Sequence, residues 1–208
     1  MQATSTTVKA TTTGAGKTER QRRDMVTTAV RWLPQRGMAA VNLIEVARAV
    51  GAPRGSIYHY FPGGRDQLLQ EALEVAHKSG LRMVEKAAKH SASVEAFIQS
   101  VFSTSLQQIG LDSFTGGCPV GAAVLSYETE NTSFQAQTQL AFAEWQQLMA
   151  ASLMQLGIKN QSQAIELAQG ILMAYEGALV CAKGARDPQM FDSAARMVLA
   201  LAGSMTGK

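Results

Sequence analysis

Residues 42–62 read NLIEVARAVGAPRGSIYHYFP, which is two short helical patterns separated by a turn. The first pattern begins at Asn42, whose side chain can cap a helix, and Glu45 three residues later can reach back to the helix start. Gly51 ends this helix, the next two residues form a tight turn, and residues 54–60 form a second short helix. Two short helices joined by a turn that contains glycine make a helix-turn-helix.

A longer helical pattern precedes this pair and braces it. Residues 17–36 carry Val26, Ala29, Val30 and Leu33 at helical spacing, which predicts one inward-facing apolar stripe. In a helix-turn-helix the second short helix lies in the major groove of DNA. We therefore expect DNA contacts from the polar and small residues of this second helix. We also expect them from the capping residue before the first short helix, and from the glycine and the arginine at the start of the helix that follows. The predicted DNA-binding residues are Asn42, Arg54, Gly55, Ser56, Tyr58, His59, Tyr60, Gly64 and Arg65.

Charge is distributed unevenly along the chain. The formal net charge is only +3, but residues 1–65 hold ten Lys/Arg against three Asp/Glu, a net +7, and residues 66–208 carry −4. A basic N-terminal third on a mildly acidic body is typical of a protein that binds a polyanion. Charge alone fits a solvated surface equally well.

Beyond the helix-turn-helix the pattern is helical throughout, which predicts an all-α fold of about nine helices. We expect a disordered Thr-rich tail at 1–16, a three-helix DNA-binding domain at 17–64 and a helical C-terminal domain at 65–208. The expected helices of the C-terminal domain are 65–89, 94–109, 119–128, 133–156, 162–184 and 188–204.

Composition argues against several classes of protein. We find no uncharged apolar run of about 18 residues, which would indicate a membrane span, and no secretory signal. Two cysteines make no disulfide framework, so a reducing cytoplasm is expected. The three histidines form no metal-binding spacing with either cysteine, and no catalytic arrangement stands out. We therefore expect no enzyme activity, no metal, no cofactor and no membrane partner.

The segment from Gly37 to Pro62 resembles the DNA-binding domain of TetR-family transcriptional repressors, whose pattern is a Gly, a capped helix with Ile/Val-Ala, then Gly-Val-Ser-Lys-Gly-Thr-Leu-Tyr-His-His-Phe. Val41 and Pro53 replace hydroxyl residues of that pattern, so two possible phosphate or cap contacts are missing. The rest of the chain is similar to the LmrA/YxaF-like branch, repressors of drug-resistance and oxidoreductase genes. The residues that carry this second likeness are 61–68, 117–120 and 176–178.

The resemblance implies a homodimer on palindromic operator DNA, formed by pairing the last two helices, and release by a small, largely apolar effector. Two stripes would form the dimer contact: Ala168, Ile171, Leu172, Tyr175, Leu179 and Ala182 on one helix, and Ala194, Met197, Val198, Leu201 and Met205 on the other. Simple intramolecular core remains the alternative for both stripes. The ligand would shift the helix that begins near Arg65 and so separate the two DNA-reading heads. Candidate ligand-binding residues are Met83, Phe97, Phe102, Phe114, Cys118, Tyr127, Phe142, Trp145, Met149, Met173, Tyr175 and Glu176.

Two other functions stay open. Cys118 precedes Pro119 at a helix start, where the helix dipole would favour a thiolate, so it could sense oxidants; a buried capping residue is the plainer interpretation. Alternatively, the chain is a helical small-molecule-binding protein that no longer binds DNA, for which Val41 and Pro53 are the only support.

Overall fold

The computed structural model describes residues 14–109, 114–126 and 132–206, and within these ranges the chain is helical and contains no strand. This confirms the predicted all-α fold. The elements are α1 (Gly14–Arg36), α2 (Leu43–Ala49), the 3-10 turn η1 (Arg54–Ser56), α3 (Ile57–Tyr60), α4 (Gly64–Lys89), α5 (Val94–Ile109), α6 (Pro119–Val124), α7 (Thr132–Gln155), α8 (Gln161–Ala185) and α9 (Gln189–Thr206). The tail predicted at 1–16 lies mostly outside the described residues.

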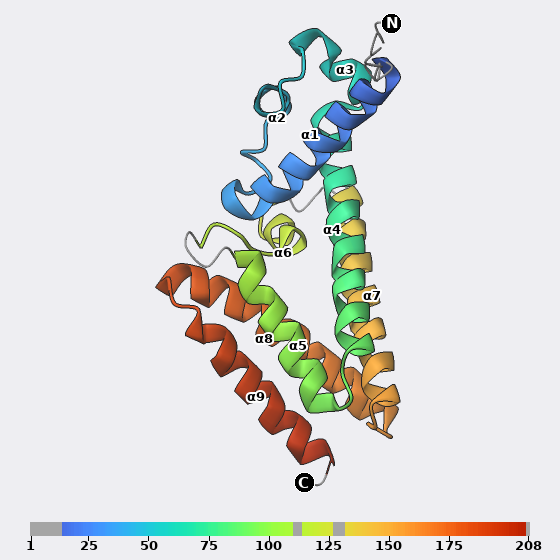
Figure 1. Cartoon of the computed structure of the whole chain (residues 1–208), viewed down its shortest axis with the longest axis vertical. Coiled ribbons are helices and arrows are strands. Elements are labelled where there is room, and N and C mark those ends of the chain that lie inside the picture. Colours follow the sequence, from blue (N-terminus) through green and yellow to red (C-terminus); the bar gives the residue numbers. More distant parts are fainter. Residues whose placement is uncertain (1–13, 110–113, 127–131, 207–208) are drawn as a thin grey trace, which may run out of the picture.

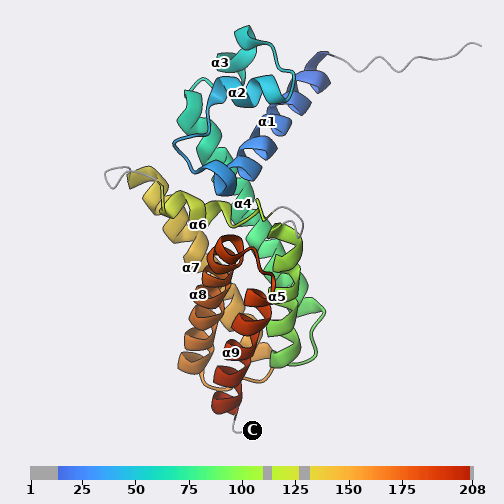
Figure 2. The same ribbon diagram turned by 90° about the vertical axis from the view of Figure 1, so that its left-hand side faces the viewer.

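The helices form a small head and a larger body (Figure 1). The head holds α1, α2, η1 and α3, and the body holds α5 and α7–α9. The long helix α4 runs from the head into the body, where it packs along α7, and α6 lies beside the lower end of α1 between the two parts (Figures 1 and 2). The head therefore contacts the rest of the chain mainly through the packing of α1 against α4 and α6.

Local sequence signals explain the head. Asn42 caps α2, because its Oδ1 accepts from the backbone N–H groups of Ile44 at 2.8 Å and Glu45 at 3.2 Å. The predicted return contact from Glu45 is wrong: its carboxylate lies 3.4 Å from Nη1 of Arg36 instead. Gly51 ends α2 at a φ of +66°, a left-handed conformation that glycine adopts without steric cost.

Two helix boundaries differ from the predicted ones. Helix α1 begins at Gly14, three residues earlier than expected, so the last three residues of the predicted tail are helical. Helix α6 ends at Val124 rather than at 128, because a turn at 125–126 follows and Ser126 bonds back to the carbonyl of Ala122. The other predicted helices agree with the structure to within two residues.

The predicted dimer stripe of α8 is intramolecular core. All six of its predicted residues are buried within the chain, because α8 packs between α7 and α9. Of the α9 stripe, Ala194 and Val198 are buried in the same way. Helix α8 is also the one described helix long and apolar enough to cross a membrane, a property that a core helix shares. Met197 of the predicted α9 stripe is exposed, at 71%, and the exposed apolar side chains of α8 are ones that the stripe did not include, notably Met173 and Val180, at 68% and 61% exposure.

Candidate nucleic-acid interface and ligand cavity

The second short helix of the head presents polar side chains outward from a firmly anchored base. Tyr58 is 71% exposed, and Arg54 and His59 are exposed beside it. Ile57 and Phe61, in contrast, are buried against the rest of the head. This alternation leaves a hydroxyl, a guanidinium and an imidazole free to meet phosphates and base edges, while Gly55 carries no side chain that would hold the backbone away.

Tyr60, a predicted DNA contact, is instead part of the head's internal framework. Its ring is 6% exposed, and its hydroxyl donates to Oε1 of Gln21 at 2.8 Å. The amide of Gln21 in turn donates to the carbonyl of Gly51 at 3.3 Å. One side chain of α1 therefore bonds both to the turn after α2 and to the last residue of α3, and the Tyr60 hydroxyl is already engaged within the head.

The polar groups at the start of α4, which were predicted to contact phosphates, already make hydrogen bonds within the head. Arg65 donates from Nε to the carbonyl of Val41 at 3.0 Å and from Nη2 to that of Met38, so its guanidinium ties α4 to the loop before α2. The N–H of Gly64 bonds to the carbonyl of Phe61 at 2.9 Å. A phosphate contact from the N–H of Gly64 would have to replace its bond to Phe61. The Arg65 guanidinium has further N–H donors, and the Asn42 cap uses the side-chain Oδ1 and not the amide N–H groups from which a phosphate would accept.

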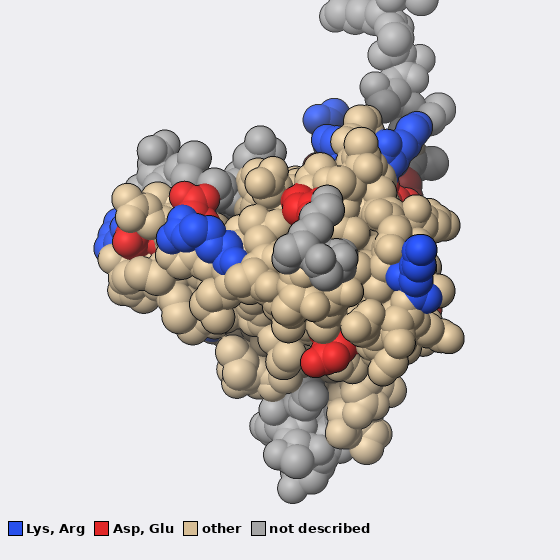
Figure 3. All heavy atoms as spheres, turned by 90° about the horizontal axis from the view of Figure 1, so that it is seen from below, with Lys and Arg blue, Asp and Glu red and all other residues tan. Residues whose placement is uncertain are grey.

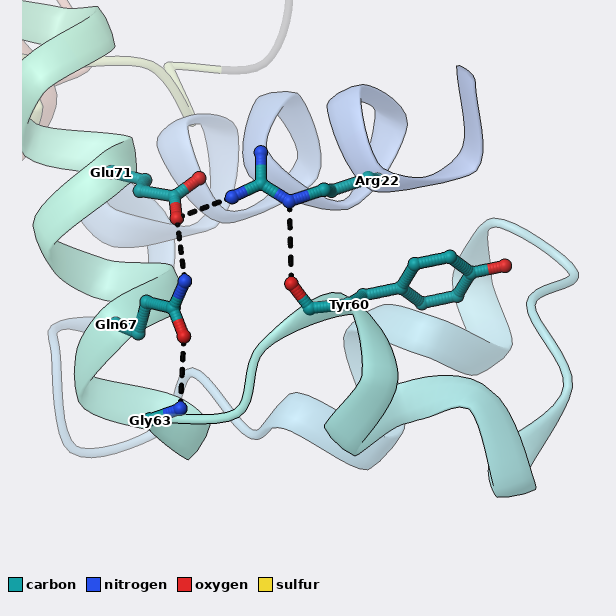
Figure 4. Close-up of polar contacts among 5 residues, drawn as sticks. All are labelled: Arg22, Tyr60, Gly63, Gln67 and Glu71. Atoms are coloured by element: carbon teal, nitrogen blue, oxygen red, sulfur yellow. Dashed lines mark hydrogen bonds and ion pairs between the residues drawn. The ribbon is translucent and has the colours of Figure 1, made fainter. Parts of the chain in front are cut away.

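A chain of hydrogen bonds fixes the head to α4 (Figure 4). Arg22 of α1 donates to the carbonyl of Tyr60 at 3.2 Å and pairs with Glu71 of α4 at 2.6 Å. The same carboxylate oxygen accepts from Gln67, whose own oxygen accepts from the N–H of Gly63 at 2.9 Å. These contacts make α1, α3 and the first turns of α4 one mechanical unit.

A cavity of about 400 Å³ lies where this unit meets the body. Six of the predicted ligand residues line it: Met83, Cys118, Trp145, Met149, Tyr175 and Glu176. Its walls come from α4, α7, α8 and the segment before α6, and its last wall is α1 of the head, through Val30, Arg31, Pro34 and Gln35. The sequence prediction missed this α1 wall. The signal was present, because Val30 belonged to the apolar stripe, but that stripe was assigned wholly to packing within the head.

Other predicted ligand residues lie elsewhere. Phe102 and Phe142 stand behind the cavity wall, with ring centroids 6.4 Å from Tyr175 and 5.6 Å from Trp145, and Phe97 is buried core. Phe114 stacks against Arg186, and Met173 is exposed on α8, so neither lines the cavity. Tyr127 lies outside the described residues.

Cys118 and Glu176 form a partly buried pair at the cavity wall. The Cys118 sulfur caps α6 by accepting from the N–H of Gly121 at 3.3 Å. Burial raises the pKa of the Cys118 thiol well above its ordinary value, and the negative charge of Glu176 raises it further. The prediction that the helix start favours a thiolate is therefore wrong, since desolvation outweighs the helix-end contacts. Burial also raises the pKa of Glu176, partly offset by the hydrogen bond from the thiol.

Charged side chains are sparse on the face opposite the head (Figure 3). The end of the molecule opposite the head carries scattered Lys/Arg and Asp/Glu among mostly uncharged residues (Figure 3). Among the described residues, no group of three or more His, Cys, Asp or Glu side chains could hold a metal ion.

Comparison with known proteins gives concordant matches along the chain. Residues 26–72 match the family model "Bacterial regulatory proteins, tetR family", and residues 93–197 match "Transcriptional regulator LmrA/YxaF-like, C-terminal domain". An uncharacterised HTH-type transcriptional regulator of Mycobacterium tuberculosis is 33% identical over 171 residues, covering 80% of this chain and 86% of its own length. The uncharacterised regulator YxaF of Bacillus subtilis is 27% identical with the same coverage. A solved structure of the TetR-family regulator CifR, a cysteine mutant complexed with 26-bp operator DNA, has a TM-score of 0.72 at 19% identity and covers 86% of this chain and 94% of its own.

Proposed function

This chain belongs to the TetR family of bacterial transcriptional regulators, and we propose that it is a repressor that binds a palindromic operator as a homodimer and is released by a small, largely apolar effector. It is a DNA-binding regulator with an LmrA/YxaF-like C-terminal domain, and its family is not one of enzymes. It acts in the bacterial cytoplasm, where its DNA is.

The observation that carries the proposal is the outward presentation of Arg54, Tyr58 and His59 on a helix whose other side is buried. DNA specificity requires side chains that reach base edges from a backbone held in a fixed position. The bonds from Gln21 and Arg22 hold that backbone. The related fold of CifR complexed with operator DNA supports the same use of the head.

Dimerisation is supported by an exposed apolar face on α8 and α9. Met173, Gly177, Val180 and Gly184 follow one another at helical spacing on α8, and all are exposed, as is Met197 of α9. Exposed apolar side chains beside glycines allow two helices to approach closely. A second copy that covers this face by twofold symmetry would place two heads on a palindromic site.

The effector would act on α1 directly as well as on α4. Both helices line the cavity, and both belong to the unit that carries the DNA-reading helix. Two hydrogen bonds among the described residues join the head to the body near the cavity: Lys183 donates to the carbonyl of Pro34 at 2.6 Å, and the N–H of Met38 donates to Ser126 at 3.0 Å. A molecule wedged between α1 and the body would tilt the head and change the spacing between the two heads of the dimer.

Gel-shift titration of the purified chain on the DNA upstream of its own gene tests the proposal. Tight, salt-sensitive and sequence-specific binding is expected, and Arg54→Ala and Tyr58→Ala should each weaken it by about tenfold to a hundredfold. Lys159→Ala, a cation removed from the far end of the body, is the matched control. Equal affinity of the native chain and both head variants would refute the assignment of the reading helix.

The dimer requires its own test. Met197→Glu places a charge on the exposed apolar face, and sedimentation should then report a monomer with weak operator binding. A Met197→Glu dimer as stable as the native one would show that this face is not the interface.

A further inference from the structure

We propose that the molecule bound in the cavity is electrically neutral and mostly apolar, and that it carries an O–H or N–H group that donates a hydrogen bond to the carboxyl of Glu176. This inference rests on the proposed effector role of the cavity. It names the chemical class of the effector and the residue that selects it.

The first observation is an unsatisfied acceptor at the cavity wall. Glu176 lines the cavity, and its Oε1 is buried without a hydrogen-bond partner. A buried acceptor that has lost its water and gained no donor costs about 1–3 kcal/mol, and a carboxylate costs more. Buried polar atoms left in this state call for an explanation, and a ligand donor supplies one.

The second observation is the position of the carboxyl group between α6 and the cavity. A Cβ at Gly121 would lie 2.5 Å from Oε2 of Glu176, so this oxygen rests against the α6 backbone. The Cys118 thiol donates to the same carboxyl group. One side of the carboxyl is therefore occupied by the protein. The terminal torsion of a glutamate is broad, so a small rotation presents the unsatisfied oxygen to a molecule in the cavity.

The charge of the cavity decides between a neutral donor and a cation. Two side chains that carry opposite formal charges line it, Glu176 and Arg31. Their formal charges cancel, so a neutral molecule leaves the site balanced, whereas a cation would leave it with a net positive charge. The remaining walls include Met83, Trp145 and Met149, which favour apolar ring systems.

Three matched probes test this on the full-length chain by calorimetry at neutral pH: β-naphthol, which has a donor; its methyl ether, which has none; and β-naphthylmethylamine, which is a cation. We expect β-naphthol to bind at least about tenfold more tightly than the ether, the effect of one hydrogen bond to a charged acceptor. In Glu176→Met, which keeps the side-chain length and removes the acceptor, this ratio should fall to about one. Glu166→Met, on the exposed side of α8, should leave it unchanged.

Several outcomes would overturn the inference. One is a ratio that survives in Glu176→Met, a second is tightest binding of the amine by the native chain, and a third is the absence of binding by all three probes. If Glu176→Met fails to fold, Glu176→Gln decides: it keeps one neutral acceptor, so the ratio should shrink but stay above one. Failure of the repressor function is separate, because it would appear as β-naphthol binding without any loss of operator DNA.

Discussion

Replacing Gly80 by alanine would make the new methyl group overlap sterically with the indole of Trp145. A Cβ at this position lies 2.4–2.5 Å from three indole atoms, whereas ordinary contacts lie at 3.4–4 Å. The indole cannot retreat freely, since its N–H donates to the carbonyl of His77 at 3.0 Å and Phe142 packs edge-on at 5.6 Å. Gly80 is therefore required by a close approach between α4 and α7.

The expected cost follows from three opposing terms. Overpacking a core position costs about 1–3 kcal/mol. Weakening the indole hydrogen bond adds about 1 kcal/mol. Alanine in a helix interior gains about 1 kcal/mol over glycine. The net loss is about 1–3 kcal/mol, which lowers the melting temperature of a chain of this size by about 2–4 °C for each kcal/mol.

Urea unfolding followed by circular dichroism, at one fixed protein concentration, measures this loss. Gly184→Ala is the control: nothing lies within 4 Å of its added Cβ, so it should be neutral or stabilising. Trp145→Ala removes the indole atoms that clash, so Gly80→Ala should cost at least about 1 kcal/mol less in that background. The same cost in both backgrounds, or a stabilising Gly80→Ala in the native chain, would refute the reasoning.

Three further predictions concern the framework and the partly buried pair. Arg22→Met removes the bonds to Glu71 and Tyr60 and should lower the free energy of unfolding by about 1 kcal/mol in thermal melts. The control Lys78→Met breaks the exposed pair with Glu74 and should lower it by less than about 0.5 kcal/mol. Equal losses in the two variants would contradict a structural role of the Arg22 bonds. Iodoacetamide followed by mass spectrometry should modify exposed Cys181 at least about tenfold faster than Cys118, because burial and Glu176 raise the pKa of the Cys118 thiol and keep it neutral; equal rates would disprove this. Since burial raises the pKa of Glu176, its ionised form opposes folding above that pKa, so Glu176→Gln should stabilise the chain at neutral pH and the gain should shrink as the pH falls; a gain that grows on acidification would reverse the sign.

The sequence predicted those parts of the molecule that depend on local signals. Asn42 and Gly51 mark the ends of α2 because a cap and a left-handed turn need particular residue types. Which face of a helix meets which neighbour is not local. Tyr60 and Tyr58 are the same residue type two positions apart, yet one bonds to Gln21 and the other faces solvent. The α8 stripe failed for the same reason, because spacing identifies an apolar face without saying whether the chain itself or a second copy covers it.

Helix α1 connects the cavity directly to the DNA-reading helix. Its first half holds the reading helix through Gln21 and Arg22, and its second half forms a wall of the cavity through Val30 and Pro34. A rigid helix transmits displacement along its length without any rearrangement between the two ends. The bond from Arg22 to Glu71 couples α4 to the same movement, so α1 and α4 would tilt the head together. A displacement of α4 alone would strain this bond, so the proposed effector would move both helices and not α4 by itself.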